Sequence, residues 1–172
     1  MTPAAKEFVR LINDIDRSKY RTEVFSDFCE MGYCALAKKA SPFTEQQDAL
    51  EAQYMEVVGR YRDKDDVRKM PELLGIALGE IGKGGCDFLG MVAGEIGALD
   101  SRLGQFFTPY EVSRLMAEIN LSNVDQMIDE QGFITLQEPA AGAGGMLMAV
   151  ADVIEGKGHN LETSVWIEAV EL

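Results

Sequence analysis

The stretch FITLQEPAAGAGG, residues 133–145, decides the fold of the second half of the chain. Its first part, residues 133–137, has the apolar and β-branched character of a short strand, and a glycine-rich loop follows it. An apolar helix is expected over residues 146–154, and a second strand over residues 164–170. Strand, glycine loop, helix and strand in this order predict a βαβ unit whose two strands run parallel.

The residues before this unit are expected to form helices. Apolar residues recur at the three- and four-residue spacing of one helix face after Thr2, after Ser18 and after Thr44, each of which is expected to cap its helix. A fourth helix is expected over Met70–Ile81. The expected buried faces are Phe8, Leu11, Ile12 and Ile15; Val24, Phe28, Met31 and Ala35; and Leu50, Tyr54, Val57 and Tyr61. The glycines within residues 82–85 interrupt the pattern, so the sequence predicts a helical domain over residues 1–82.

A further helix start precedes the first strand. Thr108 is expected to cap it, with Pro109 at the first helical position and Glu111 closing a capping box. The most apolar stripe of this helix is expected to face the core and comprises Val112, Leu115, Met116 and Ile119. Trp166, on the second strand, is expected to lie in the core as well.

The charge of the chain is acidic and unevenly distributed. Of 16 Lys and Arg and 29 Asp and Glu, residues 1–86 carry 13 basic and 15 acidic groups, and residues 87–172 carry 3 and 14. Binding to nucleic-acid backbones depends on Lys and Arg, so the acidic second half of the chain is expected to repel DNA. Any contact with DNA is expected from the first half. The candidate basic face there comprises Arg10, Arg17, Lys19 and Arg21.

Other features predict a cytoplasmic protein without a metal site. The longest uncharged run, residues 139–151, is shorter than the roughly 20 apolar residues of a membrane-spanning helix, and the first residues lack the apolar segment of a signal peptide. Cys29, Cys34 and Cys86 lie among apolar residues and are expected to be buried free thiols. With one histidine, His159, the chain lacks paired metal-ligand spacing.

The glycine loop has the outline of a nucleoside-binding site. Glycines after a strand let the backbone approach a ligand, and the following helix offers its N-terminal N–H groups. Glu171, at the end of the second strand, could accept hydrogen bonds from ribose hydroxyls. Glu138 disfavours a pyrophosphate and favours a ligand with an ammonium or sulfonium charge. The loop fits neither the dinucleotide fingerprint nor the P-loop, and a tight turn without a ligand remains the alternative.

Two motifs resemble one enzyme family. EPAAGAGG, residues 138–145, resembles the S-adenosylmethionine loop of N6-adenine DNA methyltransferases, and GQFFTP, residues 104–109, resembles their upstream motif. Their order and spacing are similar to those of the modification (M) subunits of type I restriction–modification systems, and DFLG at residues 87–90 adds to the likeness. The resemblance implies an α plus α/β fold, in which the helical domain precedes the first βαβ unit of a Rossmann-like methyltransferase domain over residues 87–172.

The resemblance also implies roles for particular residues. Glu138 would contact the methionyl amino group of S-adenosylmethionine, and Glu171 would bind its ribose. The remaining residues implied in cofactor binding are the loop positions Ala140, Gly142 and Gly144 and the upstream positions Phe107, Thr108 and Pro109. Ala141 and Ala143 depart from the side chains common in the family, but contacts there are expected to be made by the backbone.

One motif of the family is absent from these residues. N6-adenine methyltransferases hold the flipped adenine with an (N/D/S)-P-P-(Y/F) motif, whereas none of the five prolines here are adjacent. No residue is therefore assigned a catalytic role. We interpret the chain as the N-terminal portion of a site-specific DNA adenine methyltransferase that is inactive by itself. DNA and a specificity subunit, or other restriction–modification subunits, are its expected partners. The alternative is a non-catalytic helical interaction module that keeps a relic methyltransferase loop.

Overall fold

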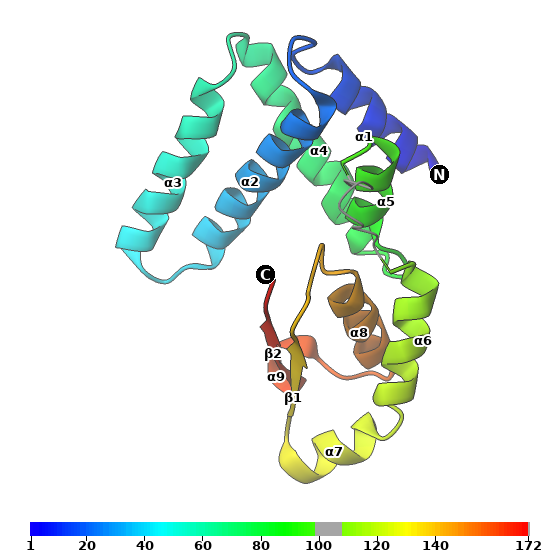
Figure 1. The fold of residues 1–172 in the computed structure, drawn as a ribbon. Helices are drawn as coiled ribbons and strands as arrows, with labels where there is room; N and C mark the ends of the chain where they lie inside the picture. Colours follow the sequence, from blue (N-terminus) through cyan, green and yellow to red (C-terminus); the bar gives the residue numbers. More distant parts are fainter. Residues whose placement is uncertain (99–107, 172) are drawn as a thin grey trace. The chain divides into compact units, whose positions relative to one another are not determined.

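The computed structural model describes residues 1–98 and 108–171, which fall into two compact units (Figure 1). The first unit comprises Met1–Gly82 and Met91–Asp100, and the second comprises Lys83–Gly90 and Ser101–Leu172. Helix α5 (Phe88–Glu95) thus begins in the second unit and ends in the first. Within the described ranges, no helix is both long enough and apolar enough to cross a bilayer.

The first unit is built from helices, as the sequence predicts. They are α1 (Pro3–Asp14), α2 (Arg21–Ala40), α3 (Thr44–Gly59) and α4 (Lys64–Ile81). Helix α3 returns alongside α2, while α1 and α4 pack together and against α2 (Figure 1). Apolar side chains from these helices fill the interior, where the rings of Phe8 and Phe28 meet edge-on at a centroid distance of 5.1 Å.

The helix starts follow local capping chemistry, and three expectations about them need correction. Thr2 caps α1 as expected, since its side chain accepts a hydrogen bond from the Ala5 N–H. Ser18 does not cap α2, because its N–H and hydroxyl both bond the Asp16 carboxylate in a turn. Thr44 is the first residue of α3 rather than its cap. Helix α4 begins six residues earlier than expected, with Asp63 as its cap.

A buried carboxylate organises the polar interior of the first unit. Asp27 is only 3% exposed, and it accepts hydrogen bonds of 2.7 Å from both Arg60 and the Tyr61 hydroxyl. Lys19 lies 3.4 Å from the same carboxylate and over the Tyr61 ring. Burial, together with the bond to Asp27, raises the pKa of Tyr61. Desolvation of the Asp27 charge is thereby offset by three partners.

The four residues of the expected basic face all have partners within the first unit. Arg10 and Arg17 pair with Asp14 on α1, Arg10 also pairs with Glu7, and Lys19 pairs with Glu23 and Asp27. Arg21 donates to backbone carbonyls at the end of α1, including those of Ile12 and Ile15. Arg10, Arg17 and Lys19 are therefore paired with acids of the same unit, and Arg21 is held by backbone carbonyls.

The second unit contains the predicted parallel pair of strands. Its elements are α6 (Tyr110–Asn120), α7 (Val124–Gln131), β1 (Ile134–Glu138), α8 (Gly145–Gly156), α9 (Leu161–Ser164) and β2 (Val165–Ala169). Strands β1 and β2 are parallel, with Ile134 opposite Val165 and Glu138 opposite Ala169. The parallel pairing is confirmed, and β1 lies one residue later than expected.

The core of the second unit lies between its helices and the sheet, and it corrects the expected orientation of α6. Helix α6 packs against α8 (Figure 1) through Ser113 and Ala117, whose small side chains allow close approach. The predicted stripe of Val112, Leu115, Met116 and Ile119 is instead exposed, Ile119 by 65%. Leu121 and Val124, which follow α6, also lie in this core. The other buried core residues come from β1 and α8 and are Ile134, Ala149, Val150, Val153 and Ile154.

Three further expectations about burial are wrong, and one of them concerns Ala35, which is exposed on α2. Trp166 is 51% exposed, since it lies on the other face of β2 from the side chains that reach the core. Cys29 is exposed on α2, whereas Cys34, five residues further on, is buried as expected. His159 lies near the end of α8, where its ring and Lys157 both contact the carboxylate of Asp125 on α7.

Candidate functional site

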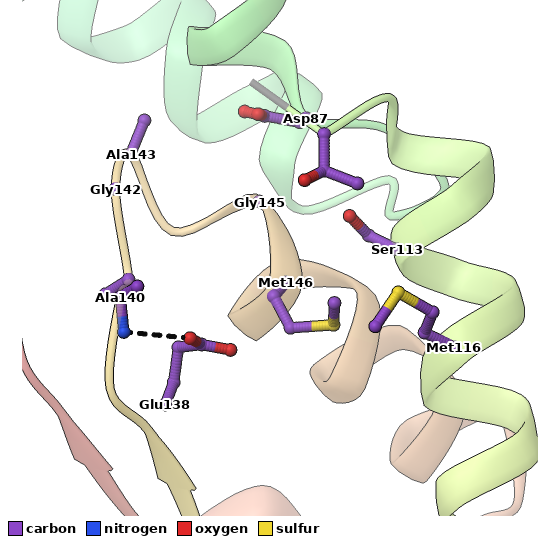
Figure 2. Close-up of a pocket in the computed structure, with 11 residues that line it drawn as sticks. Asp87, Ser113, Met116, Glu138, Ala140, Gly142, Ala143, Gly145 and Met146 are labelled. Atoms are coloured by element: carbon purple, nitrogen blue, oxygen red, sulfur yellow. Dashed lines mark hydrogen bonds between the residues drawn. The ribbon is translucent and has the colours of Figure 1, made fainter. Parts of the chain in front are cut away.

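A pocket of about 260 Å³ lies in the second unit, where β1 ends and α8 begins (Figure 2). It is lined by the end of β1, the glycine loop, the first turn of α8, one face of α6 and the residue before α5. The lining residues are Asp87, Thr108, Ser113, Met116, Glu138, Ala140, Ala141, Gly142, Ala143, Gly145 and Met146. The pocket thus forms at the carboxyl end of a parallel strand, where open α/β sheets bind ligands.

The glycine loop needs glycine at two of its positions. Gly142 has φ of +53° and Gly144 has φ of +84°, a region that residues with a Cβ rarely adopt. The Gly144 N–H donates to the Ala141 carbonyl and closes a turn, and the Ala141 N–H donates to the Val170 carbonyl after β2. The loop is therefore tied to the second strand and leads directly into α8.

Glu138 lies at the end of β1, half-buried, and Figure 2 shows its carboxylate directed into the pocket. One oxygen, Oε1, accepts a 3.0 Å hydrogen bond from the Ala140 N–H, which restrains the side chain. The other oxygen accepts no hydrogen bond from the described residues. A carboxylate held in this way can receive a cationic donor, so the position expected for Glu138 agrees with the pocket geometry.

Glu171 lies at the other side of the same loop. Its carboxylate accepts a 2.6 Å hydrogen bond from the Gly142 N–H, so the residue expected to bind ribose also supports the loop backbone. It does not line the pocket itself. Val170, next to it, donates its N–H to the Glu138 carbonyl and extends the β-ladder past the strand ends.

The other predicted positions lie close to the pocket or outside the described residues. Thr108 lines the pocket, but it does not cap α6 as expected. Pro109 holds the cap position instead of the first helical position, and no side chain among the described residues caps this helix. Ala140 and Gly142 also line it, while Gly144 precedes the first residue of α8. Phe107, with the rest of GQFF, lies outside the described residues.

Asp87 is a pocket residue that the sequence analysis did not assign to the site. Its carboxylate accepts a 2.8 Å hydrogen bond from the Gly90 N–H and caps the start of α5. A Cβ on Gly90 would lie 2.1 Å from that carboxylate, and one on Gly145 would lie 3.1 Å from it. The cap therefore requires an aspartate at position 87 and a glycine three residues later. This spacing in DFLG could have indicated Asp87 from the sequence.

Ser113, Met116 and Met146 were also missed. Ser113 is fully buried on α6, and its hydroxyl finds no hydrogen-bond partner among the described residues. The two methionines face each other across the pocket (Figure 2). The most apolar stripe of α6 predicted the wrong buried face, so Ser113 was not expected in the interior. The small residues at positions 113 and 117 would have indicated the face that packs against α8.

A further carboxylate, that of Asp152 on α8, joins segments that lie next to the pocket. It accepts hydrogen bonds from the Gly85 N–H at 2.6 Å and from the Tyr110 hydroxyl. Burial and the bond to Asp152 together raise the pKa of Tyr110 to about 12. These contacts attach the first turn of α6 and the segment before α5 to α8.

The electrostatics of the pocket combine both signs. Glu138 and Asp87 contribute carboxylates, whereas α8 begins at the pocket without a side-chain cap and presents the positive end of its dipole. Such a site suits a ligand that carries both cationic and anionic groups. Within residues 1–98 and 108–171, no group of three or more His, Cys, Asp or Glu side chains could hold a metal ion.

Comparison with known proteins finds one family model that matches this region. Residues 88–168 match the family model described as N-6 DNA Methylase, which covers slightly less than half of the chain. No curated protein and no solved structure gave a significant match. The resemblance to N6-adenine DNA methyltransferases is confirmed by this match, and the narrower resemblance to type I modification subunits stays a prediction.

Proposed function

Because residues 88–168 match the N-6 DNA Methylase family model, we propose that the second unit is the cofactor-binding part of a methyltransferase acting on adenine N6 in DNA. The cofactor is S-adenosylmethionine, which when bound supplies an electrophilic methyl group on a sulfonium. The observation that carries the proposal is the half-buried Glu138 carboxylate, which is directed into a pocket at the carboxyl end of a parallel strand.

The residues of the pocket fit the amino-acid end of this cofactor. The oxygen of Glu138 that the Ala140 N–H leaves available accepts from the methionyl ammonium. The backbone of Ala140 and Gly142 forms one wall, and Gly144 brings the loop into α8. A site that already has carboxylates and an uncapped helix start receives a zwitterion with little rearrangement.

The remaining roles extend outward from the pocket. Thr108 and Pro109, with Phe107, hold the methionine end from the upstream side. Glu171 binds the ribose with the oxygen that the Gly142 N–H leaves available. The GQFFTP motif further supports a type I restriction–modification setting, in which a specificity subunit is the partner that selects the DNA sequence.

The titration of the chain with S-adenosylmethionine tests the cofactor role. Glu138→Ala removes a charge-assisted hydrogen bond and should weaken binding by about 10- to 100-fold, measured from amide chemical shifts in NMR. Glu168→Ala is the matched control, since it removes an exposed carboxylate from β2 that contacts Gln137 outside the pocket. Equal affinities for the two variants would remove Glu138 from the site. Absence of saturable binding by the unmodified chain would favour the interaction module.

Methyl transfer is tested separately. The 172 residues carry no double-proline motif and the second half has a strongly acidic balance, so we propose that this chain alone transfers no methyl group to DNA. The measurement is incorporation of tritiated methyl from S-adenosylmethionine into unmethylated genomic DNA. Incorporation above background that is lost in Glu138→Ala would show that the motif is dispensable.

A further inference from the structure

Ser113 presents an unsatisfied polar atom at the pocket. The residue is 0% exposed, and its hydroxyl has no hydrogen-bond partner among the described residues. It nevertheless lines the pocket, and Figure 2 shows the hydroxyl directed toward the space between α6 and the first turn of α8. A buried hydroxyl without a partner destabilises the fold, whereas alanine at this position would pack at no such cost. A hydrogen bond from this hydroxyl to a ligand would explain why position 113 holds serine instead of alanine.

The surroundings of Ser113 indicate which ligand group it meets. Gly145 and Met146 of the first turn of α8 line the same pocket, and this 12-residue helix has no side-chain cap. Its first N–H groups and its dipole favour a negative charge. The two carboxylates of the pocket, Glu138 and Asp87, are the partners for positive groups. A hydroxyl near an uncapped helix start acts as a donor to an anion.

We propose that Ser113 is a cofactor-binding residue that donates a hydrogen bond to the carboxylate at the amino-acid end of S-adenosylmethionine. Glu138 takes the ammonium of the same end, so the two residues recognise the two charges of an α-amino acid from α6 and β1. This inference rests on the proposed function, and it adds a specificity determinant that distinguishes the intact cofactor from one that lacks the carboxylate.

Decarboxylated S-adenosylmethionine is the probe that separates the two contacts, because it keeps the ammonium and the sulfonium and lacks only the carboxylate. Ser113→Ala should weaken binding of S-adenosylmethionine by about 10-fold or more and leave binding of the decarboxylated compound unchanged. Glu138→Ala should weaken binding of both. Ser122→Ala, at an exposed serine just beyond α6, is the matched control and should change neither.

The stability of the variant provides an independent measurement. If Ser113 serves the ligand rather than the fold, Ser113→Ala raises the midpoint of thermal unfolding or leaves it unchanged, because it removes an unpaired buried hydroxyl. A lower midpoint together with weaker binding of both compounds would assign Ser113 to the fold and overturn the inference. Higher stability with selective loss of S-adenosylmethionine binding is the result that supports it.

The remaining outcomes distinguish the inference from the proposed function. Unchanged affinity of Ser113→Ala for S-adenosylmethionine, while Glu138→Ala loses it, would overturn the role of Ser113 and leave the cofactor pocket in place. A chain that binds neither compound would overturn the proposed function and the role of Ser113 with it. Both titrations use the full 172-residue chain, with the amide signals of Gly142 and Gly145 as local reporters of the loop.

Discussion

In the first unit the buried carboxylate of Asp27 is surrounded by Lys19, Arg60 and Tyr61, whereas in the second unit the buried hydroxyl of Ser113 has no partner among the described residues. The ends of helices differ in the same way. Arg21 occupies the carbonyls at the end of α1, while α8 begins at the pocket without a side-chain cap. Polar groups that satisfy one another stabilise a fold, and polar groups left unsatisfied at a pocket are available to a ligand.

The largest loss of stability is expected from Asp27→Ala, which removes the carboxylate at the centre of the first unit's polar interior. The change leaves the Tyr61 hydroxyl buried without its acceptor and separates Arg60 and Lys19 from their common partner. We expect a loss of about 3 kcal/mol in the free energy of unfolding, measured with urea. Asp48→Ala, at an exposed acid on α3, is the control and should shift it by less than about 0.5 kcal/mol. Similar values for the two variants would mean that the Asp27 network contributes little.

Gly142→Val tests whether the conformation of the loop depends on glycine. A Cβ there would meet no protein atom within 4 Å, so the expected cost arises from φ of +53° and not from a clash within the chain. A β-branched residue in this region should cost about 1–2 kcal/mol and displace the Gly142 N–H from Glu171.

Gly142→Asn is the matched control, because asparagine tolerates this region of φ and ψ better than valine does. Thermal unfolding of both variants and the amide signals of the loop are the measurements. A valine variant as stable as the asparagine variant would show that the loop adopts another conformation in solution.

Tyr110→Phe should cost about 1 kcal/mol through the lost hydrogen bond to Asp152, and it should also change the pH dependence. The folded chain holds the pKa of Tyr110 at about 12, above the ordinary value of 10.0. The contribution of a group with a raised pKa is complete below its unfolded value and is lost as the pH rises through the folded value. The difference in stability between the unmodified chain and Tyr110→Phe should therefore shrink from about pH 10 to pH 12.

Thermal midpoints of the two proteins over this pH range provide the measurement. Tyr61, whose pKa is also raised, titrates in both proteins and cancels in the difference. A difference that stays constant up to pH 12 would contradict a buried bond between Tyr110 and Asp152.

The smallest effect is expected from a glycine-to-alanine substitution made on one helix of each unit. Gly79 lies exposed on α4 with open space around its Cα, so Gly79→Ala should stabilise the chain by about 0.5–1 kcal/mol through helix propensity. Gly90→Ala, also in a helix, would place a Cβ 2.1 Å from the Asp87 carboxylate and displace the cap of α5. It should therefore gain less than Gly79→Ala in urea unfolding, and equal gains would show that Asp87 moves freely.

The sequence by itself determined the order of strand, glycine loop, helix and parallel strand, because glycines and short β-branched runs act over neighbouring residues. It also indicated Glu138, Thr108, Ala140 and Gly142, which lie together at one pocket, since the two motifs place them on adjacent segments. The starts of α2, α3 and α4 were less well predicted, because several polar residues compete for each cap and local hydrogen bonds such as that of Ser18 to Asp16 select among them.

Only the tertiary structure decided which face of α6 is buried and what reaches the pocket. Periodicity favours the most apolar stripe, but packing against α8 selected the face with Ser113 and Ala117, because small side chains let two helices approach closely. Asp87 lies far from the loop in sequence, and its proximity to Gly145 arises only when the chain folds back on itself. The same holds for the hydrogen bond from the Gly142 N–H to Glu171. Such contacts depend on the arrangement of whole elements, so the position of Glu171 at the end of the second strand indicated a place near the loop but not its hydrogen bond to Gly142.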